Sequence, residues 1–108
     1  MNIGAGIKLI RKNLGMQQSQ LARRSGITQT ALSLIETGAQ KPSHNTLKKI
    51  CDTLNISESL IYIVSIEESD VPENKKEIYS PMCSSLKNMV MQVVNEKNSA
   101  LIEELVAD

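Results

Sequence analysis

Large aromatic residues are scarce in this 108-residue chain, which has no tryptophan or phenylalanine and only Tyr62 and Tyr79 to supply phenyl rings. A core made from this composition must be aliphatic, and the many Leu, Ile and Val residues suit a helical bundle. The length allows one domain, or one small domain with an appendage.

Cysteine and histidine are also rare. Cys51 and Cys83 lie in different segments without C-x-x-C spacing or a histidine at ligand spacing, which argues against a structural disulfide or a zinc site. Cys51 is expected to be a small buried residue. The lone His44 has no partners that suggest a catalytic base, so it is interpreted as a surface residue or a minor phosphate contact. Without a nucleophile–base pair or a Gly-rich phosphate loop, the sequence predicts no enzyme activity, cofactor or metal.

Long hydrophobic runs are absent. The longest, Leu60 to Val64, is far too short to span a bilayer, and no signal peptide is recognisable. We therefore expect a cytoplasmic protein without a membrane partner.

The formal net charge is zero, but the charges are unevenly distributed. Residues 1–66 carry eight Lys or Arg against three acids, giving +5, whereas residues 67–108 carry four Lys against nine acids, giving −5. This asymmetry favours a polyanion-binding domain followed by a tail that does not contact the polyanion. Ordinary surface charge is the alternative interpretation.

The segment from Gln18 to Thr37 predicts two short helices joined by a tight turn. Leu21 and Ala22 fall on the inner face of the first helix, and Leu32 and Ile35 on the inner face of the second. Ala22 must be small because the two helix backbones approach closely there.

Two residues are suited to the turn between these helices. Gly26 can adopt a positive φ without a Cβ penalty, and Thr28 can cap the second helix. Burial of the inner face leaves an outward face composed of Gln29, Thr30, Ser33 and Leu34. A short outward helix led by Gln and Thr is typical of the recognition element of a helix-turn-helix.

Several pieces of the chain match one known pattern in register: Ile7-Lys8-Leu9-Ile10-Arg11, Gln18-Ser19-Gln20-Leu21-Ala22, Gly26-Ile27-Thr28, Leu32-Ser33-Leu34-Ile35-Glu36-Thr37-Gly38, Lys41-Pro42, and Leu47 through Ser57. Through them, residues 4–65 resemble the Cro/phage-repressor (XRE-type) family of helix-turn-helix regulators. The resemblance implies an all-α fold with a five-helix, lambda-repressor-like DNA-binding bundle. Beyond residue 66 it implies nothing.

The resemblance also implies roles for individual residues. It pairs Arg11 with Glu36, and because two buried charges must pair, we predict an ion pair that locks the first helix onto the recognition helix. It assigns Gln18 to a phosphate contact at a helix N-terminus, although Gln17 is a weak cap before it. It assigns Lys41 to a second phosphate contact.

Base reading is expected from the start of the recognition helix. The Gln29 carboxamide can pair with adenine N7 and N6, and Thr30 can contact a base or a phosphate. Leu34 departs from the family pattern; it either touches a thymine methyl group or leaves base reading to the two residues before it. The predicted DNA-binding set is Gln18, Thr28, Gln29, Thr30, Ser33, Leu34 and Lys41. Arg23 and Arg24 fit phosphate contacts and helix-dipole charges equally well.

Three further helices complete the predicted bundle. The first runs from about residue 3 to 13 and ends near Gly15, and the fourth runs from about 43 to 54 with Asn55 as its αL cap. A fifth, capped by Ser57, covers about 58–66. Its apolar surface exceeds what one narrow face can bury, so we expect a partner to cover part of it.

The predicted domains are a DNA-binding domain over residues 1–66, an acidic linker over 67–80 and a C-terminal helix over 81–108. Ser80 and Pro81 resemble an N-cap followed by an N1 proline. Downstream, an apolar stripe predicts one long amphipathic helix, or two short ones separated within residues 95–99. Such a helix needs a partner face, either the bundle or, in our preferred interpretation, the same helix of another subunit.

Together these features predict a sequence-specific DNA-binding transcriptional regulator, a repressor that binds a pseudo-palindromic operator as a homodimer through residues 29–37. Two alternatives remain. One is an antitoxin-like module whose C-terminal segment binds a toxin while the protein regulates its own gene. The other is a protein-interaction module that no longer reads DNA.

Overall fold

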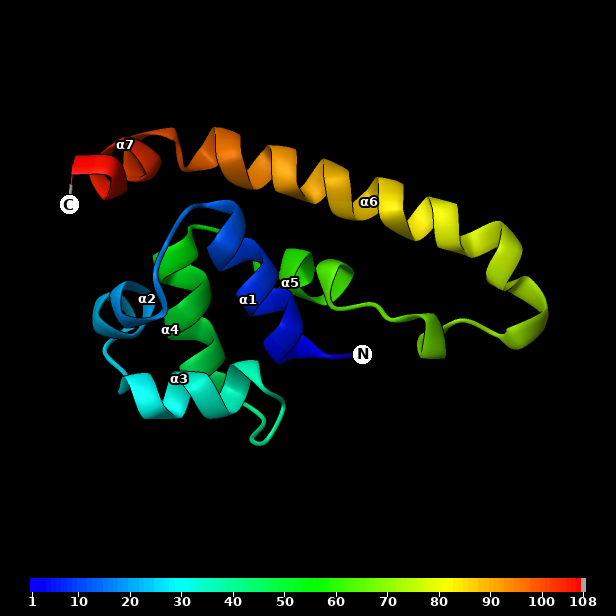
Figure 1. Ribbon diagram of the computed structural model, residues 1–108, viewed down its shortest axis with the longest axis horizontal. Coiled ribbons are helices and arrows are strands. Elements are labelled where there is room, and N and C mark those ends of the chain that lie inside the picture. The colour runs from blue at the N-terminus through cyan, green and yellow to red at the C-terminus, as the bar shows by residue number, and fades with distance from the viewer. Residues whose placement is uncertain (108) are drawn as a thin grey trace.

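The computed structural model describes residues 1–107, which are helical apart from their turns and connections. The helices are α1 (Ile3–Asn13), α2 (Gln18–Ser25), α3 (Gln29–Glu36), α4 (His44–Leu54), α5 (Glu58–Val64), α6 (Lys76–Lys97) and α7 (Ser99–Ala107). Two 3₁₀ turns, η1 (Glu68–Asp70) and η2 (Glu73–Lys75), connect α5 to α6. The predicted all-α fold, with a five-helix bundle and a C-terminal helical segment, is confirmed (Figure 1).

The ends of the bundle helices follow local sequence signals. Asn2 caps α1 through its side chain, which accepts a hydrogen bond from Ala5 N at 3.0 Å. Asn55 has a φ of 52° and ends α4 as the predicted αL residue. Ser57 stands at the N-cap position of α5, but its side chain makes no capping hydrogen bond, so that part of the prediction is wrong.

The core is aliphatic, as the composition requires. Its fully buried large side chains come from α1 to α6: Ile7, Ile10, Leu21, Leu32, Ile50, Leu54, Ile61 and Val94. Cys51 is also buried, as predicted, and burial raises the pKa of its thiol to about 11. The bundle thus shares its core with a residue of the C-terminal segment.

Two glycines let α1 approach its neighbours closely. A Cβ atom on Gly4 would overlap the carbonyl oxygen of Ile35 in α3, and one on Gly6 would overlap the hydroxyl of Ser65 after α5. The Asn2 amide also donates to the Ser65 carbonyl at 2.9 Å. Helix α1 is therefore packed between the recognition helix and the end of α5.

The segment after α5 differs from the prediction in its helix start. Helix α6 begins at Lys76, not at Pro81, and the proline lies inside it. Within a helix, Pro81 lacks the N–H that would bond the carbonyl of Glu77, and its ring crowds that carbonyl, but the N–H groups of the preceding residues are unaffected, so those residues can still be helical. The predicted Ser80 cap is accordingly absent.

The second half of α6 and the whole of α7 fold back on the bundle. Val94 is fully buried, and Val90 and Leu105 are 5% and 9% exposed. Our preferred interpretation, in which the whole C-terminal stripe pairs with another subunit, is wrong for this part. The predicted break lies at Asn98, between α6 and α7.

The apolar surface of α5 is covered by the same chain. Ile61 and Val64 are buried, and α5 packs against α1, α4 and α6. We expected a partner to cover part of α5; within the chain, α6 lies over this surface instead.

Helix α6 and helix α3 lie on opposite sides of the bundle (Figure 1). The N-terminal part of α6 extends past the bundle and lengthens the molecule to 46 × 29 × 18 Å. Within residues 1–107, no helix is both long enough and apolar enough to cross a membrane. Because α6 lies on the side of the bundle opposite α3, the outer face of α3 is left uncovered.

Candidate DNA-binding face

The turn between α2 and α3 has the predicted geometry. Gly26 has a φ of 71°, and the hydroxyl of Thr28 accepts a hydrogen bond from Ala31 N at 3.0 Å. On the inner side of the two helices, Ala22, Leu32 and Ile35 are buried. The packing of these residues fixes which side of α3 faces outward.

A buried ion pair connects α1 to the end of α3. Arg11 Nε lies 2.8 Å from Glu36 Oε2, and Arg11 Nη2 lies 2.9 Å from Glu36 Oε1, so the pair is bidentate. Arg11 Nη1 also donates to the Met16 carbonyl at 2.9 Å. The two side chains are 9% and 2% exposed, and the ion pair expected from the sequence is present.

Two glutamines extend this arrangement to the surface. Gln18 Nε2 donates to Glu36 Oε1 at 3.1 Å, and Gln29 Nε2 donates to Gln18 Oε1 at 3.4 Å. A continuous polar chain therefore runs from Arg11 through Glu36 and Gln18 to the exposed amide of Gln29. Sequence reasoning named all four residues but did not foresee that Gln18 touches both Glu36 and Gln29, because that contact depends on the crossing of α2 and α3.

The exposed side of α3 borders an open hollow of about 340 Å³. Five residues of the predicted DNA-binding set line it: Gln18, Gln29, Thr30, Ser33 and Leu34. Leu34 is 41% exposed, which places an apolar side chain among amides and hydroxyls. Thr28 precedes this helix and is exposed, but its hydroxyl is engaged in the cap.

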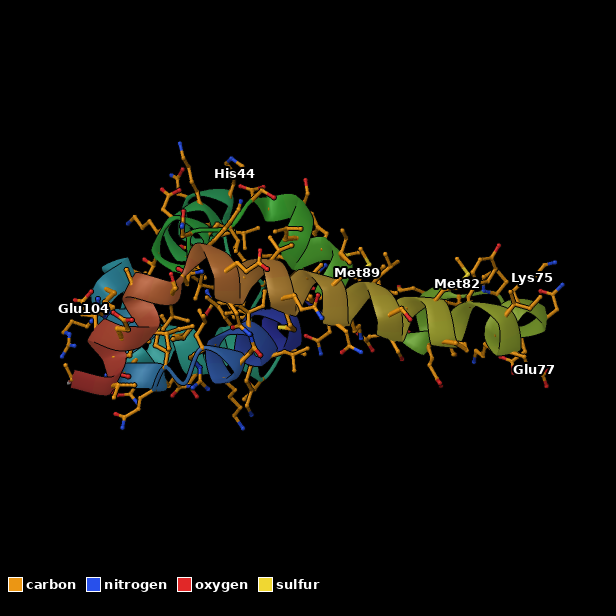
Figure 2. The ribbon with its side chains drawn as sticks, turned by 90° about the horizontal axis from the view of Figure 1, so that it is seen from above. His44, Lys75, Glu77, Met82, Met89 and Glu104 are labelled. Atoms are coloured by element: carbon orange, nitrogen blue, oxygen red, sulfur yellow. The ribbon has the colours of Figure 1, made fainter. Side chains whose placement is uncertain are left out.

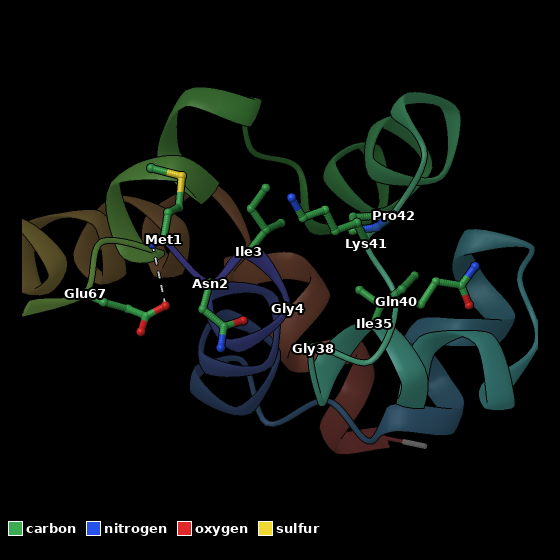
Figure 3. A pocket seen from close by; sticks show the side chains of 10 residues that line it. All are labelled: Met1, Asn2, Ile3, Gly4, Ile35, Gly38, Gln40, Lys41, Pro42 and Glu67. Atoms are coloured by element: carbon green, nitrogen blue, oxygen red, sulfur yellow. Dashed lines mark ion pairs between the residues drawn. The ribbon is translucent and has the colours of Figure 1, made fainter. Parts of the chain in front are cut away.

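Lys41 lies apart from this hollow. It is exposed on the loop after α3 and lines a separate groove of about 420 Å³, beside Ile3 and Gly4 of α1 (Figure 3). The loop is held to α3 because Gln40 N donates to the Leu34 carbonyl at 3.1 Å. Lys41 is thus beyond the C-terminal end of α3, while Gln29 is at its start.

Of the two adjacent arginines, Arg24 is engaged by the C-terminal segment. Its guanidinium lies 3.3 Å from Glu104 Oε1 in α7, whereas Arg23 is exposed. His44 is exposed, and its Nδ1 lies 3.8 Å from Glu58 Oε1. In residues 1–107, no three His, Cys, Asp or Glu side chains gather in a way that could hold a metal ion.

Comparison with known families agrees with this geometry. A helix-turn-helix family model matches residues 7–61, which include α2, the turn and α3. The chain belongs to the XRE-type helix-turn-helix family. The family predicted from the sequence is thereby confirmed.

Curated relatives resemble part of this helix-turn-helix chain. An uncharacterised HTH-type transcriptional regulator of Mycobacterium tuberculosis is 36% identical over 60 residues, which are 56% of this chain and 43% of that protein. The ImmF control region 10 kDa protein of Bacillus phage phi105 is 34% identical over 65 residues, 60% of this chain and 72% of that protein. The immunity repressor protein of the same phage is 34% identical over 79 residues, 71% of this chain and 55% of that protein.

The helix-turn-helix chain thus matches less than half the length of its mycobacterial relatives. No solved structure matches it.

Proposed function

We propose that this helix-turn-helix protein is a sequence-specific transcriptional repressor that binds a pseudo-palindromic operator as a homodimer. The observation that carries the proposal is the polar chain from the buried Arg11–Glu36 pair through Gln18 to Gln29. It holds an amide donor and acceptor at the exposed start of α3, where a recognition helix contacts base edges.

In this proposal α3 enters the major groove with its first turn leading. The Gln29 carboxamide pairs with adenine, which offers an acceptor at N7 and a donor at N6. Thr30 and Ser33 supply hydroxyls that can bond bases or phosphates, and Leu34 supplies an apolar contact for a thymine methyl group. The hollow that borders these side chains gives the edges of the bases room to enter.

Phosphate contacts on either side of the base contacts would set the position of α3. Gln18 stands at the start of α2, where first-turn N–H groups attract an anion, and Thr28 stands directly before α3. Lys41 follows the other end of α3. Residues 1–66 would thus form the reading domain, and the remainder would serve association between subunits.

The assignment as a repressor rests on similarity. One relative is named as an immunity repressor and another as a control region protein of the same phage. The dimer is proposed because helix-turn-helix proteins that read pseudo-palindromic operators bind two half-sites about 34–36 Å apart on one face of DNA.

The test is a fluorescence-anisotropy titration of the full chain on the DNA upstream of its own gene, beside a scrambled duplex. We expect Gln29→Ala to weaken operator binding roughly ten- to hundredfold and to leave scrambled-duplex binding unchanged, since one good base pairing contributes about 1–3 kcal/mol of discrimination. Gln92→Ala is the matched control, because Gln92 is exposed on α6. Equal affinity of the parent for both duplexes, or an unaffected Gln29 variant, would contradict the proposal.

A further inference from the structure

Helix α6 carries an exposed apolar stripe over most of its length, from Ile78 to Val93. Its members are Ile78, Met82, Leu86, Met89 and Val93, which are 61%, 53%, 42%, 61% and 38% exposed. They recur every three or four residues and therefore lie along one side of the helix. Exposed side chains of this kind, gathered in one stripe, mark an interaction site more often than single exposed residues do.

The bundle of the same chain does not cover this stripe. Val90 and Val94, which are buried against the bundle, lie about 80° and 120° around α6 from the centre of the stripe at 3.6 residues per turn. Figures 1 and 2 show that the start of α6, with Lys75, Glu77 and Met82, extends beyond the bundle, while Met89 lies near its edge.

We propose that this stripe is covered by the same stripe of a second copy, with the two α6 helices antiparallel about a two-fold axis between Ser85 and Leu86. The inference rests on the proposed dimeric function and adds the interface and its orientation. Around that axis, Ile78 of one copy faces Val93 of the other, and Met82 faces Met89. The two copies of Leu86 meet beside the axis.

Charge at the ends of the stripe selects this orientation. Glu96 continues the helical spacing of the stripe beyond Val93, and Lys75, the last residue of η2, stands directly before α6 on the same edge as Met82 and Met89 in Figure 2. Neither has an ion-pair partner within residues 1–107. Antiparallel helices place Lys75 of each copy beside Glu96 of the other, whereas parallel helices place like charges together.

The position of the two bundles gives a second, independent reason. With antiparallel helices the two-fold axis is perpendicular to the plane of the two α6 helices, so both bundles lie on the same side of that plane. With parallel helices the axis runs along the helices, and the bundles lie on opposite sides. One DNA duplex can be contacted by both copies of α3 only in the antiparallel arrangement.

The separation of the two bundles also suits two half-sites on one DNA duplex. Val94, which anchors α6 to the bundle, is about 13 Å from the proposed axis along the helix, at 1.5 Å per residue. Two such bundles are about 26 Å apart along the helix direction, before the 8–10 Å sideways offset of packed helices is added. This distance approaches the spacing of about 34 Å between half-sites one turn apart.

Disulfide cross-linking in the absence of DNA tests the orientation. The background is Cys83→Ser, with buried Cys51 retained. We expect Leu86→Cys to cross-link with itself, and Met82→Cys mixed with a size-tagged Met89→Cys to form a mixed disulfide dimer. Met82→Cys alone and Met89→Cys alone should each form little disulfide-linked dimer. Self-cross-linking of both Met82→Cys and Met89→Cys would show parallel helices and overturn the proposal, as would the absence of cross-links throughout.

The mass of the full chain in solution provides a second measurement. Met82→Glu should weaken the dimer about tenfold or more, because it buries an unpaired charge in the interface. Asn88→Glu adds the same charge to an exposed position on another side of α6 and should leave the dimer intact. A chain that is monomeric at every concentration tested would overturn the inference and assign the stripe to a different protein. Specific operator binding by such a chain would still support sequence-specific DNA recognition, though not the proposed homodimer, whereas a cross-linked antiparallel dimer that binds no DNA would support only the interface.

Discussion

At the scale of single residues, Glu36 connects stability to the candidate DNA-binding face. Its Oε1 atom accepts hydrogen bonds from both Arg11 and Gln18, and its Oε2 atom pairs with Arg11. The cost of removing two charges from water offsets much of the attraction within such a buried pair, so the pair adds little net stability. Loss of one partner is nevertheless costly, because it leaves the other charge buried and uncompensated. The same carboxylate therefore acts on the core through Arg11 and on the surface through Gln18.

We predict that Glu36→Gln lowers the free energy of unfolding by about 3–5 kcal/mol, because the Arg11 guanidinium is left buried without a counter-ion. Urea denaturation followed by circular dichroism measures the loss. The double variant Arg11→Met/Glu36→Leu should recover much of that stability, since neither charge remains. It should still bind the operator more weakly than the parent, because Gln18 has lost its acceptor. A Glu36→Gln protein as stable as the parent would rule out this account.

At the scale of helices, the break between α6 and α7 is held by one side chain. Asn98 is 3% exposed, and its Nδ2 atom donates to the Leu54 carbonyl at 2.8 Å and to the Val94 carbonyl at 2.9 Å. Leu54 is the last residue of α4, where carbonyl groups have no partner within the helix. The C-terminal segment thus completes the hydrogen bonding of a bundle helix.

Asn98→Ala should lower the free energy of unfolding by about 1–3 kcal/mol, because it leaves a buried carbonyl without its donor. It should also increase hydrogen exchange at the amides of α7. Asn95→Ala is the matched control: Asn95 is exposed, and within residues 1–107 its side chain accepts one hydrogen bond, from the exposed Asn13 side chain at 2.8 Å. The same loss in both variants would mean that the buried contact with α4 has no special role.

The bounds of some helices could be predicted from the sequence, and the bounds of others could not. The bounds of α1 to α4 follow from local signals such as Gly15, Thr28 and Asn55, and the apolar spacing identified their inner faces. The start of α6 was predicted wrongly because Pro81 is a strong local signal for an N1 position, whereas the helix tolerates it internally. The docking of α6 depends on contacts between distant segments, for which the sequence carries no comparable local signal.

The candidate DNA-binding face was likewise predictable from the sequence only in part. Exposure of Gln29, Thr30 and Leu34 was predictable because their neighbours at helical spacing are apolar and buried. The contact from Gln18 to Glu36 was not, because neither residue is a neighbour of the other in sequence or on one helix. The roles of these residues in binding DNA stay predictions.

At the scale of the whole molecule, the bundle and the second half of α6 share one hydrophobic core. Val94 is fully buried with residues of α1, α4 and α5, and α6 packs against α1 and α5. A reading domain that ended at residue 66 would expose this surface. Small domains with one core usually unfold in a single transition, so the C-terminal segment and the bundle should lose their structure together.

We therefore predict that Val94→Ala lowers the free energy of unfolding of the whole chain by about 2 kcal/mol, from two lost methyl groups and the space they leave. Hydrogen exchange measured by NMR should show the same reduction at the core amides of α1 and α4 as at those of α6. Val106→Ala makes the same chemical change at a position that is 83% exposed, and it should change stability by less than about 0.5 kcal/mol.

If the protection of α1 and α4 against hydrogen exchange were unchanged in Val94→Ala while that of α6 fell, the C-terminal segment would be an independent unit. Rigid attachment of α6 is what would let an interface on its exposed side set the distance between two recognition helices, so this experiment also examines the physical basis of the proposed dimer.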